Sequence, residues 1–146
     1  MPPKRIKPDR PLTAIARRIR KSVLTRHPSW KLHECSDNQD LCIYVPAPRA
    51  SKIEALQITT YRQDIWVGFV GANLRNAFYA VDNSRELLRI VELLLNDAAM
   101  FLITERGSKW IETTLVGPND RISVKARTKV TIFSWSGKFD RVIVGR

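Results

Sequence analysis

The chain has 146 residues, of which 44% are hydrophobic and 27% charged, and this composition argues against a disordered or fibrous protein. A single domain of this length buries roughly 68–70% of the surface that its unfolded chain exposes, so it needs neither disulfides nor a metal to hold a core. The formal net charge of +11 is the main departure from ordinary globular proteins.

The charge is concentrated in the N-terminal fifth of the chain. Residues 1–31 contain ten basic side chains and one acidic side chain, a net charge of +9, whereas the rest contains 15 basic and 13 acidic ones, a net charge of +2. Such asymmetry indicates an anionic partner: nucleic acid, an anionic membrane surface or an acidic protein. It carries no information about the fold.

Residues 1–11 are predicted to form an extended basic arm. Four prolines are interspersed there with four basic side chains, and proline disfavours helix at its own position and at the residue before it. After the arm, apolar residues recur at helical spacing, which predicts an amphipathic helix at about 12–26 that ends before Pro28. The residues of this apolar face are Leu12, Ile15, Ala16, Ile19 and Val23.

The middle of the chain changes to the period of β-strands. Segments 41–45, 53–60 and 65–70 are rich in β-branched and aromatic residues, and 77–81 is predicted as a further short strand. The connections between these segments are too short for a parallel crossover, so we expect an antiparallel meander.

A second helix is predicted at about 84–97. Asn83 and Glu86 have the spacing of a capping box, in which the two side chains satisfy free N–H groups at the helix start. A wide arc of apolar side chains, which includes Leu94, predicts that this helix packs flat against a sheet at the centre of the core.

The last third of the chain carries strand signals throughout. Strands are predicted at 100–105, 110–116, 130–135 and 139–144, with turns between them. Apolar and polar residues also alternate over 122–126, which predicts another strand with one buried and one exposed face.

Together these elements predict an α+β fold. We expect a mainly antiparallel, bent sheet or two-sheet layer with one buried helix at about 84–97 and a docked basic N-terminal helix at about 12–26. Residues 12–146 are expected to form a single domain that follows the basic extended arm, residues 1–11.

The two cysteines, Cys35 and Cys42, are expected to be reduced, half-buried residues of a cytoplasmic protein. No apolar stretch near the N-terminus is free of arginine, so no signal peptide is predicted, and the prolines together with Asp9 argue against an organellar transit peptide. No apolar run approaches the ~18 residues of a membrane span, so we expect no transmembrane segment.

No metal site, cofactor or enzymatic activity is predicted. His27, His33, Cys35 and Cys42 fall within sixteen positions, but their spacing matches no zinc pattern, and no third group is evident that would orient a cysteine–histidine pair. Glycine-rich phosphate loops and nucleophile elbows are absent from the sequence. A small nuclease is the enzymatic alternative, and no set of reacting groups can be assigned to it.

Aromatic side chains on predicted strands could stack on nucleobases, although strand aromatics more often belong to the core. The residues considered for this role are Trp66, Phe69, Trp110, Phe133 and Trp135.

The basic segment therefore leads the functional prediction. We expect a small non-enzymatic binding module that contacts a polyanion, with nucleic acid as the first choice, because lysine and arginine neutralise phosphates and arginine can bind them in a bidentate manner. The candidate nucleic-acid-binding residues are Lys4, Arg5, Lys7, Arg10, Arg17, Arg18, Arg20, Lys21 and Arg26.

The alternative is a protein-interaction module, such as an immunity, chaperone-like or inhibitor protein, whose basic helix meets an acidic partner. Two structural observations bear on the choice. An exposed basic stripe that continues to Lys125, Arg127 and Lys129 would favour a polyanion, whereas acidic side chains that cover the basic helix would weaken that interpretation.

Overall fold

The computed structural model describes residues 11–36, 38–72 and 74–146. The predicted arm, with Lys4, Arg5, Lys7 and Arg10, lies outside the described residues except for Pro11. The elements in chain order are helix α1 (Ala14–Arg26), 3₁₀-helix η1 (Pro28–His33), strands β1 (Cys42–Pro46), β2 (Ala55–Tyr61), β3 (Asp64–Val70) and β4 (Phe78–Val81), helix α2 (Ser84–Leu95), and strands β5 (Met100–Arg106), β6 (Lys109–Val116), β7 (Lys129–Phe133) and β8 (Arg141–Val144).

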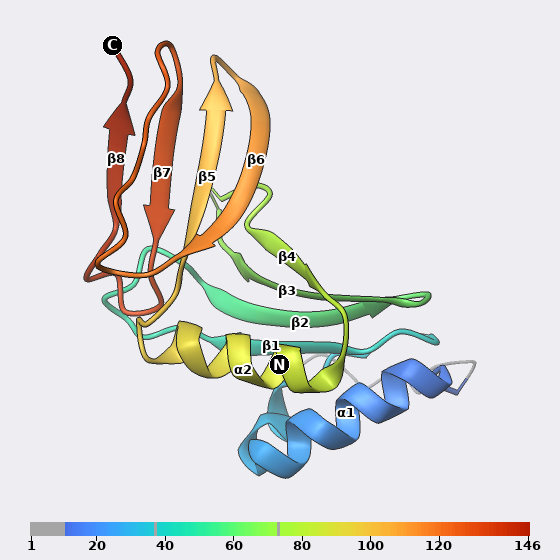
Figure 1. The fold of residues 1–146 in the computed structure, drawn as a ribbon. Helices are drawn as coiled ribbons and strands as arrows, with labels where there is room; N and C mark the ends of the chain where they lie inside the picture. Colours follow the sequence, from blue (N-terminus) through green and yellow to red (C-terminus); the bar gives the residue numbers. More distant parts are fainter. Residues whose placement is uncertain (1–10, 37, 73) are drawn as a thin grey trace.

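The strands form two antiparallel sheets, which confirms the predicted α+β class. The first sheet is the expected meander, with strand order β1-β2-β3-β4, and the second has the order β6-β5-β7-β8. Figure 1 shows the second sheet standing away from the helices, with its strands running across the direction of those in the first sheet. The two sheets meet where Phe69 of β3 contacts Phe101 of β5 edge to face, with ring centroids 4.9 Å apart.

Helix α2 packs on the first sheet as its apolar arc predicts. Leu87, Ile90, Val91 and Leu94 are buried and belong to the same core cluster as the inward-facing residues of β1, β2 and β3. Its N-terminus is capped by Asn83, whose Oδ1 accepts a hydrogen bond from the backbone N–H of Glu86 at 2.9 Å. This is the contact that the capping-box spacing predicts.

Helix α1 lies on the same side of the first sheet, next to α2 (Figure 1). Ala16, Ile19 and Val23 are buried, so the predicted apolar face is the docked face. The helix begins at Ala14, later than the predicted position 12, because the Thr13 Oγ1 caps it by accepting from the Ala16 N–H at 3.2 Å. It ends at Arg26, ahead of Pro28, as predicted.

One element was not predicted: the 3₁₀-helix η1, which starts at Pro28 and turns the chain back toward β1. Its Trp30 is buried and stacks on the His27 ring, with centroids 3.9 Å apart. Proline at a first helical position favours such a turn, and the buried Trp30 anchors it in the core.

The prediction of a strand at 122–126 is wrong. Residues 121–128, all within the described part of the chain, contain no strand. Ile122 and Val124 instead pack on a small second cluster around Met100 and Ile132, and Figure 1 shows this connection running alongside β7 and β8. An extended segment that lays one side on a sheet has the same alternation as a strand, although it joins no hydrogen-bond ladder.

The prediction of reduced cysteines is also wrong. Cys35 and Cys42 form a disulfide, and the Cys35 N–H donates to the Cys42 carbonyl at 2.8 Å. The chain reversal after η1 brings the two Cα atoms within 5.0 Å of each other, a separation at which a disulfide can form. Within the described residues, no helix is long and apolar enough to cross a membrane.

Candidate nucleic-acid interface

The docking of α1 decides which basic side chains face solvent. Because Ala16, Ile19 and Val23 point into the core, Arg17, Arg18 and Lys21 project from the opposite side and are exposed. No ion pair or hydrogen bond of these three side chains to any other described residue is formed. Residues three and four positions apart on a helix are about 5–6 Å apart at Cβ, so Lys21 neighbours both arginines.

An open hollow of about 600 Å³ lies along this side of the helix. Its lining combines cationic groups with apolar and hydroxyl side chains. This composition suits a polymer ligand in which anionic groups alternate with apolar parts. The lining residues are Leu12, Arg17, Arg20, Lys21, Leu24 and Thr25.

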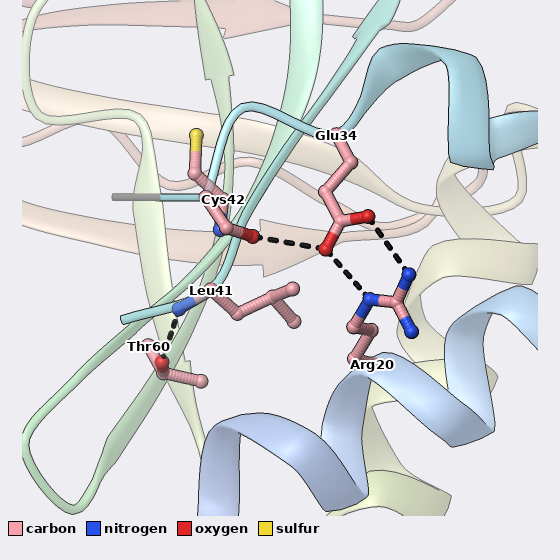
Figure 2. A network of polar contacts seen from close by, with 6 residues as sticks. Arg20, Glu34, Leu41, Cys42 and Thr60 are labelled. Atoms are coloured by element: carbon pink, nitrogen blue, oxygen red, sulfur yellow. Dashed lines mark hydrogen bonds and ion pairs between the residues drawn. The ribbon is translucent and has the colours of Figure 1, made fainter. Parts of the chain in front are cut away.

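Arg20 lies in this hollow but is already paired. Its Nε donates to Glu34 Oε1 at 2.6 Å and its Nη2 donates to Glu34 Oε2 at 3.0 Å, a bidentate ion pair that Figure 2 shows from close by. This hydrogen-bonded pairing with Glu34 raises the pKa of Arg20, and burial opposes the effect. The guanidinium is therefore a fixed cation whose fork is occupied by a carboxylate.

Arg26 is paired as well, on the other flank of the helix. Its Nη2 lies 2.8 Å from Glu92 Oε2 of α2, and both side chains are more than half exposed. An exposed pair of this kind contributes little to stability. Of the predicted site residues that the structure describes, Arg17, Arg18 and Lys21 thus present free charge, whereas Arg20 and Arg26 are neutralised by acids from elsewhere in the chain.

The exposed basic stripe to Lys125, Arg127 and Lys129, which would favour a polyanion, is not found among the described residues. These residues precede or begin β7, and β7 begins at the end of the second sheet that points away from the helices (Figure 1). The basic surface that the structure describes on α1 is therefore a local feature of that helix.

The aromatic side chains divide into two groups. Phe69 is fully buried, and Phe133 and Trp135 pack against the main core, so these three are structural. Trp66 is half-buried, and Trp110 is 48% exposed with its Nε1 donating to Thr113 Oγ1 at 2.9 Å. None of the five lies on α1, so stacking is not part of the candidate interface.

Sequence reasoning missed Glu34, which forms the bidentate ion pair with Arg20. It follows Arg20 by 14 positions and reaches it only because η1 reverses the chain. The one available signal was its position as the first acid after the long basic segment.

The residues considered for a metal site are not arranged for one. Cys35 and Cys42 are bonded to each other, so their sulfurs are not free to act as metal ligands. Across the described ranges, no group of three or more His, Cys, Asp or Glu side chains could hold a metal ion.

Comparison with known proteins finds no matching family model, no similar curated protein and no similar solved structure. The function is therefore inferred from the residues of this chain.

Proposed function

We propose that this chain is a non-enzymatic binding module that contacts a polyanion, nucleic acid in first place, through α1 and the basic arm before it. The observation that carries the proposal is the group Arg17, Arg18 and Lys21, three exposed cations that neighbour one another on one side of a docked helix and have no ion-pair partner among the described residues. Neighbouring cations can neutralise successive phosphates and release their counterions, which makes binding tight at low salt.

The setting of these cations supports the proposal further. They project from a helix whose other side is fixed in the core, so they are held close together without an ordering cost for the backbone. The hollow beside them adds Leu24 and Thr25, which can contact the sugars between phosphates.

A protein partner with an acidic surface is the second candidate, and one observation favours it. Leu32, in the 3₁₀-helix that follows α1, is a large apolar side chain with 78% of its surface exposed. A protein interface depends on such an apolar anchor, and its affinity falls less steeply with salt.

The cellular location also stays a proposal. From the sequence we predict a cytoplasmic location, but the Cys35–Cys42 disulfide favours an oxidising compartment, since persistent disulfides are rare in the cytosol. Cell fractionation combined with thiol labelling of the native protein would decide between the two.

The test of the proposed function uses the full chain, because deletion of α1 would remove buried core residues along with the charges. Fluorescence anisotropy of labelled single- and double-stranded DNA and RNA is measured with the unmodified protein and with the R17Q/R18Q/K21Q variant. We expect salt-sensitive binding that the triple substitution weakens at least tenfold. Absence of binding at low salt, with folding intact, would refute the nucleic-acid proposal.

The protein-partner candidate is separated by a second probe in the same assay. Labelled poly-glutamate presents the acidic groups of a protein without its apolar anchors, and L32S removes the exposed leucine of the module. If L32S abolishes capture of a cellular partner while nucleic acid does not bind, the second candidate replaces the first.

A further inference from the structure

Glu34 occupies the place on Arg20 that a phosphate would take. A guanidinium fork binds a carboxylate and a phosphate in the same way, through two parallel N–H donors. Here Nε and Nη2 of Arg20 both donate to the Glu34 carboxylate, at 2.6 and 3.0 Å (Figure 2). Arg20 nevertheless lines the same hollow as the exposed Arg17 and Lys21.

The carboxylate of Glu34 is held there by its surroundings. The backbone of Glu34 forms a bridge with Ile43 of β1, and the disulfide fixes the next residue, Cys35, to Cys42. The Ser36 Oγ donates to Glu34 Oε1 at 3.1 Å. Glu34 therefore faces Arg20 from a backbone that is tied to β1, and its side chain is only 19% exposed.

We propose that Glu34 is an internal competitor of the anionic ligand, which binds Arg20 in the free protein and is displaced from it by a phosphate in the complex. The inference rests on the proposed function and names the residue that regulates the same site. Displacement of a bidentate carboxylate opposes binding, so only an anion that also contacts Arg17 and Lys21 overcomes it. Glu34 thus selects polymers with closely spaced phosphates over isolated anions.

The second ion pair of the helix provides a matched control. Arg26 and Glu92 make one contact at 2.8 Å, both are more than half exposed, and neither lines the hollow. E34Q and E92Q remove the same charge from the vicinity of α1, but only E34Q frees a guanidinium beside Arg17 and Lys21. Glutamine keeps the shape of glutamate, so we expect both variants to fold.

The experiment measures the affinity of the full chain for one labelled DNA duplex, with thermal unfolding as the check on folding. We expect E34Q to tighten binding about five- to tenfold and E92Q to tighten it about twofold or less. The R20Q variant should bind more weakly, with a salt slope about one lower than that of the unmodified protein. In the R20Q background, E34Q should increase the affinity for DNA by no more than E92Q does.

The outcomes distinguish the two proposals. Equal effects of E34Q and E92Q in a protein that binds DNA would overturn the role of Glu34 and leave the proposed function standing. The role of Glu34 is also overturned if E34Q keeps its full effect in the R20Q background, because Glu34 would then act as a general charge. If neither the unmodified protein nor E34Q binds any nucleic acid, both proposals fail.

Discussion

The helix-covered first sheet and the second sheet differ in how their faces are buried. The first sheet has α1 and α2 on one face, and the large main core forms between the helices and the sheet. The second sheet shares one face with that core near Phe101, while its other face is covered by the extended segment before β7 over a cluster of four buried residues, Met100, Leu102, Val130 and Ile132.

This difference bears on function because a group of three exposed basic residues in one region can be compared with a group of three in the other. Arg17, Arg18 and Lys21 project from a helix that is anchored in the large core, beside a hollow. Lys125, Arg127 and Lys129 lie where an irregular segment enters β7, and Glu105 is the cross-strand neighbour of Lys129. The two groups of three charges thus have different settings, and our proposal assigns polyanion binding to the first group.

The comparison of the two cores is tested by a pair of alanine substitutions. Leu94→Ala should lower the free energy of unfolding by about 2–5 kcal/mol, because Leu94 is fully buried in the main core and its removal leaves a cavity. Ile122→Ala, in the segment over the second sheet, should cost about 1 kcal/mol, since Ile122 is half-buried. Urea unfolding measures both free-energy losses. A larger loss for Ile122→Ala than for Leu94→Ala would contradict the larger contribution that we assign to the main core.

The disulfide belongs to the helix-covered region and offers the next largest effect. The C35S/C42S variant should lose about 2 kcal/mol of stability, because the bond closes a short loop and restricts the unfolded chain. Thermal and urea unfolding of the variant and of the oxidised protein measure the loss, and titration of the native protein should find no free thiol. Two reactive thiols in the native protein, together with unchanged stability of the variant, would show that the cysteines are reduced.

The smallest expected effect concerns His27 at the C-terminal end of α1. Burial lowers the pKa of His27, nearby Arg26 lowers it further, and Glu92 opposes them. A histidine whose pKa in the folded state is below its unfolded value of about 6.5 contributes stability that is complete above that pH and is lost as the pH falls below it.

His27→Phe is the matched variant for this effect, because it keeps a ring against Trp30 and cannot be protonated. We expect the melting temperature of the unmodified protein to fall more between pH 7.5 and 5.5 than that of the variant. Parallel pH profiles would show that His27 does not contribute to this dependence.

The sequence predicted what depends on local periodicity. The docked face of α1, the arc of α2 and the Asn83 cap were confirmed because spacing along the chain determines them. The 3₁₀-helix, the disulfide and the Arg20–Glu34 pair were not predicted, since each depends on a chain reversal that buries Trp30. The strand prediction for 122–126 was wrong because alternation shows only that one side of the segment is buried. It does not show that the segment pairs with a neighbouring strand.

The same division holds for the candidate site. The helical period places four basic residues away from the apolar face, Arg17, Arg18, Arg20 and Lys21. All of them except the half-buried Arg20 are exposed in the structure. Which cations are neutralised did not follow, because Glu34 and Glu92 come from other elements and meet Arg20 and Arg26 only in the folded chain.

The central claim is that position, rather than charge alone, makes α1 the polyanion site, and the salt dependence of DNA affinity tests it most directly. The unmodified protein, R17Q/R18Q/K21Q and K125Q/R127Q/K129Q are compared, the last two having the same net charge. Each phosphate contact on duplex DNA contributes about 0.9 to the slope of log affinity against log salt. We predict that the α1 variant loses about three such contacts and the β7 variant keeps the slope of the unmodified protein. Equal loss of slope in both variants would contradict the claim.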